Sequence, residues 1–245
     1  MRIFIVFEAI FKFFGRMLPG SVGMSSAERV YDSGVRLQRR GRLEEALERY
    51  TEAIRLDPSL VQAYSNRGSA YLNLGDPETA ISDLDEAIRL NPELAVAYST
   101  RGLAYTNLGD FGQAVKDLNR AVRLNPNFAD AYSSRGFAHR AAGRLERAIS
   151  DFDQAIRIDE KFSVAYNNRA DVYIEMDQPD RAMPDLDMAI KLDPWFAVAF
   201  ANRAFARTML KNDADATKDV ESAVKLGVDR DLLVEKVAEF KERAE

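Results

Sequence analysis

The sequence predicts an all-α fold, an array of stacked helical hairpins, from three observations. A 34-residue unit, AVAYSTRGLAYTNLGDFGQAVKDLNRAVRLNPNF at residues 95–128, recurs in altered form along almost the whole chain. Within each unit, small and apolar residues recur at helical spacing in two runs that a short turn separates. Shifting the chain by one period also aligns residues of one type: Gly34, Gly68, Gly102 and Gly136; Tyr64, Tyr98, Tyr132 and Tyr166; Pro58, Pro92, Pro126 and Pro194. Such a period indicates hairpins that each bury an apolar face against the next.

Composition narrows the functional class. The chain has 245 residues and a net charge of −5, with acidic and basic residues interspersed. Nucleic-acid binding needs clustered Lys and Arg, so we expect no nucleic-acid partner. The chain has no Cys and a single His, His139, and this composition excludes the common zinc ligand sets and thiolate chemistry. We therefore expect no metal, no cofactor and no catalytic residue, in a protein of the reducing cytoplasm.

Residues 1–26 precede the array and differ from it in composition. The run IFIVFEAIFKFF is aromatic and apolar, but Glu8 and Lys12 interrupt it before it reaches the ~20 residues that a bilayer requires. Its charges fall on one side of a helical wheel, which predicts an amphipathic helix. Three interpretations stay open: a peripheral membrane anchor formed by residues 1–18, a helix that caps the end of the array, and a true start at Met24 instead of Met1.

The array itself is expected to hold six pairs of antiparallel helices. Gly75 can take the left-handed conformation that ends a helix, Asp76 can cap the next helix, and Pro77 suits its first turn. Repeat five departs from this pattern, because Asp177 replaces the turn glycine and Pro184 falls where it should bend or delay the second helix. The six repeats are expected at 27–60, 61–94, 95–128, 129–162, 163–196 and 197–230.

A periodic pair of opposite charges supports the hairpin. Repeats two to six carry Arg at the seventh position and Asp at the twenty-third, and an antiparallel hairpin places these positions opposite each other. The pairs are Arg67 and Asp83, Arg101 and Asp117, Arg135 and Asp151, Arg169 and Asp185, and Arg203 and Asp219. We expect an ion pair within each of these repeats; the alternative is a ladder of arginines that binds anions.

Residues 231–245 follow the last repeat and are typical of a capping helix. Leu232, Leu233, Val237 and Phe240 are expected to form one apolar stripe, while most other residues are charged. A helix of this kind covers the end of an array and keeps it soluble. Trp195 lies in the turn between repeats five and six, and we expect its side chain to pack between those repeats.

The aligned residues resemble the tetratricopeptide repeat family, in an array of the bacterial type. Repeat three carries the family's pattern at Tyr98, Gly102, Tyr105, Gly109, Ala114, Leu118, Ala121 and Pro126. The resemblance covers about residues 27–230 and implies a right-handed α-solenoid in which the first helix of every repeat lines a concave groove. Carried over position by position, it implies a peptide-binding groove formed by Asn66, Thr100, Ser134, Asn168, Asn202, Leu103, Phe137, Asp171, Phe205, Val164 and Val198.

The chemistry of these residues suits an extended peptide. An Asn carboxamide can donate to one backbone carbonyl and accept from one backbone N–H, so a spaced row of Asn can read a main chain. The apolar members form a patch of the kind that marks binding sites. Members of the family that bind chaperones hold a terminal carboxylate with Lys and Arg, which the corresponding positions of this chain lack. We therefore expect no carboxylate clamp.

The sequence thus predicts a non-enzymatic scaffold that holds an extended segment of a partner protein or peptide in its groove. The alternative is a membrane-associated assembly or recruitment factor that residues 1–18 anchor at the bilayer surface.

Overall fold

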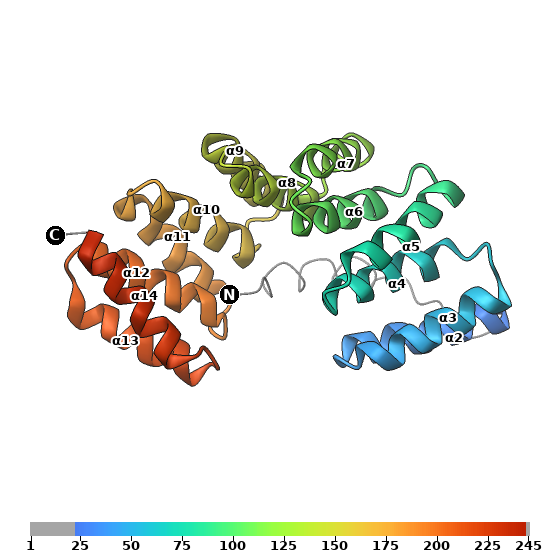
Figure 1. Ribbon diagram of the computed structural model, residues 1–245, viewed down its shortest axis with the longest axis horizontal. Coiled ribbons are helices and arrows are strands. Elements are labelled where there is room, and N and C mark those ends of the chain that lie inside the picture. The colour runs from blue at the N-terminus through green and yellow to red at the C-terminus, as the bar shows by residue number, and fades with distance from the viewer. Residues whose placement is uncertain (1–22, 244–245) are drawn as a thin grey trace. The chain divides into compact units, whose positions relative to one another are not determined.

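A computed structural model describes residues 23–243 of the chain (Figure 1). These residues form thirteen α-helices and no strand, which confirms the predicted all-α fold. The predicted amphipathic segment, residues 1–18, lies outside the described residues. The helices are α2 (Ser26–Arg39), α3 (Leu43–Leu56), α4 (Val61–Asn73), α5 (Pro77–Leu90), α6 (Ala95–Asn107), α7 (Phe111–Leu124), α8 (Ala129–Ala141), α9 (Leu145–Ile158), α10 (Ser163–Glu175), α11 (Pro179–Leu192), α12 (Ala197–Met209), α13 (Asp213–Lys225) and α14 (Arg230–Arg243).

The chain divides into two compact units at the turn between α8 and α9. The first unit ends at Ala142 and holds α2 to α8, and the second starts at Gly143 and holds α9 to α14. The two helices of the fourth repeat therefore belong to different units.

Within each unit, antiparallel helix pairs stack on one another (Figure 1). We call α2, α4, α6, α8, α10 and α12 the first helices of their repeats, and α3, α5, α7, α9, α11 and α13 the second helices. In the first unit, α2 packs on α3, α4 on α5 and α6 on α7, and each second helix also packs on the first helix that follows it. The second unit repeats this arrangement from α9 to α13.

In the second helices of repeats one to five, the core combines one large side chain with flanking alanines. The large residues occupy the twenty-fourth position of their repeats and are 0 % exposed; they are Tyr50, Leu84, Leu118, Phe152 and Leu186. An alanine stands four residues before and three residues after each of them, and these alanines are also fully buried. Small residues on the same face let the neighbouring helix axes approach closely.

The turn chemistry of repeat two is confirmed. Gly75 has a φ of 84°, in the left-handed region. The Asp76 side chain accepts a hydrogen bond of 3.0 Å from the backbone N–H of Thr79, and Pro77 is the first residue of α5. A helix therefore ends and the next begins within three residues.

Two repeats make this turn without glycine. Asp177 and Lys211 replace it in repeats five and six and have φ values of 55° and 59°. A left-handed conformation costs a residue with a side chain roughly 1–2 kcal/mol. The stacked helices on both sides hold these two residues in it.

Pro184 does not delay its helix. The second helix of repeat five, α11, begins at Pro179 and continues through Pro184 to Leu192. Of the two effects expected at Pro184, the delay is therefore wrong, because the helix starts five residues earlier with Pro179 at its own favourable first position, and the bend stays a prediction.

The C-terminal helix α14 packs mainly against α12 and less against α13. Leu233 is buried in the core that α12 and α13 form, and Val237 packs at its edge. Leu232, in contrast, is 60 % exposed. The predicted stripe is wrong at Leu232, because successive residues of a helix are turned by about 100° and only one of the two leucines can face the core.

Candidate functional site

The arginines at the seventh position of the repeats form a regular series of polar contacts. In four repeats, Nε and Nη2 donate hydrogen bonds of 2.6–2.9 Å to the two carboxylate oxygens of the aspartate in the same repeat. This confirms the predicted pairs Arg67–Asp83, Arg101–Asp117, Arg169–Asp185 and Arg203–Asp219. Arg135 and Asp151 belong to different units, and their pair stays a prediction.

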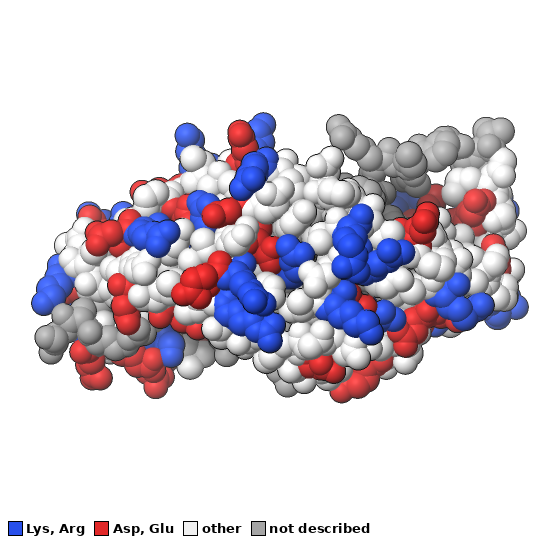
Figure 2. Space-filling view, turned by 90° about the horizontal axis from the view of Figure 1, so that it is seen from above, with Lys and Arg blue, Asp and Glu red and all other residues white. Residues whose placement is uncertain are grey.

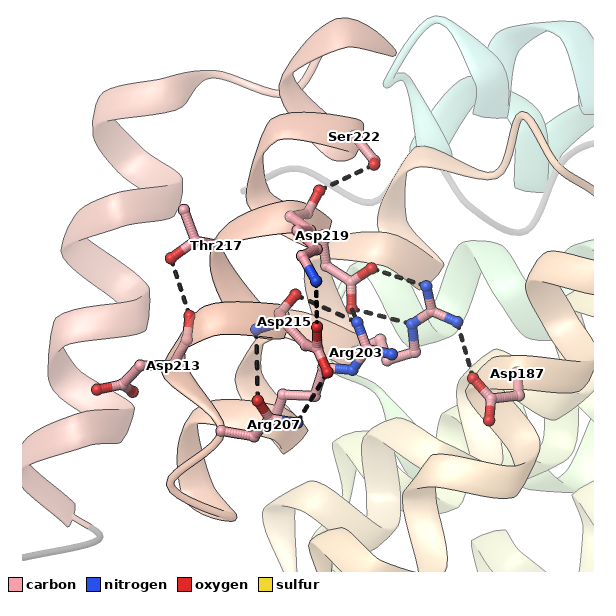
Figure 3. Close-up of polar contacts among 10 residues, drawn as sticks. Asp187, Arg203, Arg207, Asp213, Asp215, Thr217, Asp219 and Ser222 are labelled. Carbon is pink, nitrogen blue, oxygen red and sulfur yellow. Dashed lines mark hydrogen bonds and ion pairs between the residues drawn. The ribbon is translucent and has the colours of Figure 1, made fainter.

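Most of these arginines also bind a carboxylate of the preceding repeat. Nη1 of Arg203 donates to Asp187 at 2.7 Å, and Figure 3 shows the guanidinium between Asp187 and Asp219. Arg101 and Arg169 bind the corresponding residues of their own preceding repeats, Asp85 and Asp153. Each guanidinium therefore joins two consecutive repeats.

Aromatic rings complete the arginine sites. The guanidinium carbon lies 5.2–5.8 Å from the ring centroid of the aromatic residue at the fourth position, in the pairs Arg67–Tyr64, Arg101–Tyr98, Arg135–Tyr132, Arg169–Tyr166 and Arg203–Phe200. Burial opposes the charge of Arg101, but hydrogen bonds to Asp117 and Asp85 outweigh it, and the pKa of Arg101 is raised. These arginines are occupied within the fold, which favours a structural role over an anion-binding ladder.

Opposite charges are intermixed on the face of the molecule that Figure 2 draws. Figure 2 shows Lys, Arg, Asp and Glu side by side over the face that it draws. Many are paired within one helix turn, such as Arg55 with Glu52 at 2.7 Å and Arg89 with Glu86 at 2.6 Å. Exposed pairs of this kind stabilise a fold by about 0–1 kcal/mol each.

The predicted groove residues of the first unit are largely buried. Thr100 and Ser134 are each 1 % exposed, and Asn66 is 7 % exposed. Leu103 is also buried, while Phe137 is half-buried and packs with Leu103 in one apolar cluster. The apolar core therefore brings Leu103 and Phe137 together, while Asn66, Thr100 and Ser134 keep little of their side chains at the surface.

Asn66 has a partner that the sequence did not reveal. Its Nδ2 donates a hydrogen bond of 2.9 Å to the hydroxyl of Tyr31, whose ring lies 5.8 Å from that of Tyr50. Burial raises the pKa of Tyr31 to about 12, and the hydrogen bond from Asn66 opposes part of that rise. The N–H₂ group of the Asn66 carboxamide thus makes a hydrogen bond inside the first unit.

The predicted groove residues of the second unit follow the same pattern. Asn168 and Asn202 are 8 % and 6 % exposed, and Asn167 lies between them in a chain of hydrogen bonds. Asn202 donates to Asn167 at 3.0 Å, and Asn167 donates to Asn168 at 3.4 Å. Beside this chain, Val164 is buried, whereas Asp171 and Val198 are half-buried.

Phe205, the last predicted groove residue, is covered by the C-terminal helix. Phe240 of α14 stacks on it with the ring centroids 4.8 Å apart and the planes at 25°. The sequence marked Phe240 only as part of a capping stripe, and it gave no signal that α14 reaches a groove position of α12.

The position of Trp195 differs from the prediction. The side chain is 79 % exposed, so it does not pack between repeats five and six. Its backbone N–H donates to the Asp193 side chain at 3.0 Å, and this bond fixes the turn with the side chain directed outward.

Known repeat families match most of the array. A family model described as TPR repeat matches residues 36–75 and 102–143. Three models described as Tetratricopeptide repeat match residues 61–94, 129–162 and 163–194. The chain belongs to the tetratricopeptide repeat family.

Solved structures of tetratricopeptide repeat proteins share this fold. A protein from Parabacteroides merdae is 24 % identical with a TM-score of 0.71, over 88 % of this chain and 84 % of that one. A protein from Thermus thermophilus is 22 % identical with a TM-score of 0.68, over 74 % and 98 %. YrrB, described as a TPR protein with an unusual peptide-binding site, is 20 % identical with a TM-score of 0.53, over 76 % and 96 %. No curated protein matches the sequence.

Tetratricopeptide repeats are typical of non-enzymatic scaffolds, and they indicate that this protein takes part in protein–protein interaction. Among the described helices, none is long and apolar enough to cross a bilayer.

Proposed function

We propose that the protein binds an extended segment of a partner protein along the first helices of its repeats, within each unit. The observation that carries the proposal is the half-paired state of the carboxamides at the sixth position. In the second unit, Asn202 uses its N–H₂ group and Asn168 uses its oxygen, which leaves the Asn202 oxygen and the Asn168 N–H₂ group for a ligand. Together these two groups can accept from and donate to a peptide main chain.

The half-buried apolar residues add the second component of such a site. Val198 in the second unit and Phe137 in the first keep part of their surface exposed on the first helices. Apolar contacts of this kind supply affinity, whereas the main-chain hydrogen bonds set the direction and register of the peptide. The likeness to YrrB, whose description names a peptide-binding site, supports this mode of binding.

The Lys and Arg of a carboxylate clamp are lacking at the relevant positions, since the first three repeats carry Tyr31, Val35, Asn66, Val96 and Thr100 there. We therefore infer that the partner is bound through an internal segment and not through a terminal carboxylate.

Site-specific photocrosslinking of the full chain tests the proposal. A photoreactive phenylalanine replaces Val198 on α12, and in the matched control it replaces Ser150, which is exposed on the second helix α9. We expect a partner crosslinked from position 198 and not from position 150. The Asn168→Ala/Asn202→Ala variant should weaken that crosslink while circular dichroism stays unchanged. Crosslinks from position 150 alone would place the binding surface on the second helices.

A further inference from the structure

One turn position differs from its equivalents in every other repeat. The thirty-third position of each repeat lies in the turn between consecutive repeats, and repeat five places Trp195 there. The remaining repeats carry polar residues at this position: Ser59, Glu93, Asn127, Lys161 and Asp229.

The fold does not require a tryptophan at this position. In the first five repeats, the backbone N–H of the turn residue donates a hydrogen bond of 2.9–3.1 Å to the Asp or Asn side chain two residues earlier. The turn is therefore the same whether its side chain is Ser, Glu, Asn, Lys or Trp, and in all five repeats that side chain is exposed.

Exposure of the Trp195 indole leaves a large apolar surface in water. The side chain is 79 % exposed, and its neighbour Pro194 is exposed as well. Tryptophan is among the residues that most often dominate the energetics of protein interfaces. Other aromatic rings of this chain, such as Tyr98 and Tyr166, have an arginine of the fold over them, whereas no described cation lies over Trp195.

The charges around Trp195 determine what kind of partner fits. The helices α10, α12 and α14 pack side by side, and a turn between repeats precedes each of them. Packed helices lie about 8–10 Å apart, so these turns form one edge of the second unit. We call residues 159–162, 193–196 and 227–231 the turn edge. The turn edge contains five acidic residues, Asp159, Glu160, Asp193, Asp229 and Asp231, and two basic residues, Lys161 and Arg230.

We propose that Trp195 anchors a cationic segment of a partner protein at the turn edge of the second unit. An arginine or lysine of the partner lies over the indole ring, and the carboxylates of the turn edge attract its other positive charges. An anionic bilayer fits this edge poorly, because the carboxylates would repel it. This surface is separate from the first helices that the proposed function uses.

The single tryptophan of the chain makes the proposal directly measurable, because all indole fluorescence comes from Trp195. The probe is a phage-displayed library of random twelve-residue peptides, selected on the full-length protein and screened against the Trp195→Ser variant. Ser occupies the same turn position in repeat one, so this variant keeps the turn. Glu93→Ser, a change at the same turn position in the first unit, is the matched control.

The expected result has three parts. Peptides that depend on Trp195 carry a net positive charge, and their synthetic forms shift the indole emission to shorter wavelength. Their affinity falls at least tenfold in Trp195→Ser, falls less in Trp195→Phe, and does not change in Glu93→Ser. Selected peptides that bind Trp195→Ser as tightly as the wild type, or dependent peptides that are acidic, would overturn the proposal. A blue shift with phosphatidylglycerol vesicles and none with any peptide would also overturn it, in favour of a membrane surface.

Discussion

Gly102 lies where α6 and α7 approach most closely, and its replacement by alanine tests the packing within one repeat. A Cβ atom at this position would lie 2.6 Å from Cγ of Leu118 and 3.1 Å from the backbone oxygen of Ala114. Leu118 is 0 % exposed, so it has little room to move away. Overpacking of this kind costs about 1–3 kcal/mol, and the better helix propensity of alanine returns up to about 1 kcal/mol.

We therefore expect Gly102→Ala to lower the free energy of unfolding by about 1 kcal/mol. Gly112 provides the matched control, since it is an exposed helical glycine whose added Cβ would meet only Asp110 Oδ1, at 3.4 Å. Gly112→Ala should raise the free energy of unfolding by about 0.5–1 kcal/mol. Urea denaturation followed by far-ultraviolet circular dichroism measures both changes.

A compensating change distinguishes overpacking from other causes. Valine is shorter than leucine, and repeat six combines Ala204 with Val220 at the two corresponding positions, whereas repeat five combines Ala170 with Leu186. The double variant Gly102→Ala/Leu118→Val should therefore lose less stability than the sum of the two single variants. If Gly102→Ala is as stable as the wild type, or if the two changes add, the close approach of α6 and α7 does not limit this position.

Three further predictions follow from the arginine sites and the turns. Asp117→Ala should lower the free energy of unfolding by about 3–5 kcal/mol, because it leaves Arg101 paired only at the surface. Asp85→Ala should lower it by less than about 1 kcal/mol, because the Asp85 side chain is half exposed. Thermal and urea denaturation measure both changes, and equal losses would contradict the difference in burial. Lys211→Gly should raise the free energy of unfolding by about 1 kcal/mol, because glycine adopts the left-handed conformation without strain. A melting temperature below that of the wild type would contradict this prediction. Hydrogen bonds from Thr79 lower the pKa of Asp76. The stability that results is present above the unfolded pKa of about 4 and is lost as the pH falls through the lower folded value. In acid titration, Asp76→Asn should therefore lose less stability than the wild type, and parallel curves of stability against pH would show that Asp76 does not contribute.

The period of the sequence was sufficient to predict the local architecture. It placed the helix pairs, the capping chemistry of Gly75 to Pro77 and the pairing of Arg101 with Asp117, because each depends on residues within one repeat. The second carboxylate, Asp85, comes from the preceding repeat. Its recurrence at the twenty-fifth position was visible, but the stacking register that brings it to Arg101 is set by packing between repeats.

The misplaced residues are those whose environment depends on tertiary packing. Nothing in the pattern distinguished the outward Leu232 from the buried Leu233, because the direction of α14 is set by its contact with α12. Trp195 was expected to pack between repeats five and six because it lies in the turn that joins them, yet the turn that the hydrogen bond to Asp193 holds leaves its side chain exposed. The positions of Asn66 and Asn202 were predicted, whereas their partners Tyr31 and Asn167 emerge only when adjacent first helices are packed together.

Binding of a partner to the first helices of each unit can be measured by hydrogen–deuterium exchange of the full chain. The exchange is compared with and without a partner segment identified by crosslinking. We expect slower exchange on binding in first helices such as α4, α6, α10 and α12, and unchanged exchange in their second helices α5, α7, α11 and α13. Protection confined to the second helices would show that the partner binds elsewhere than we propose.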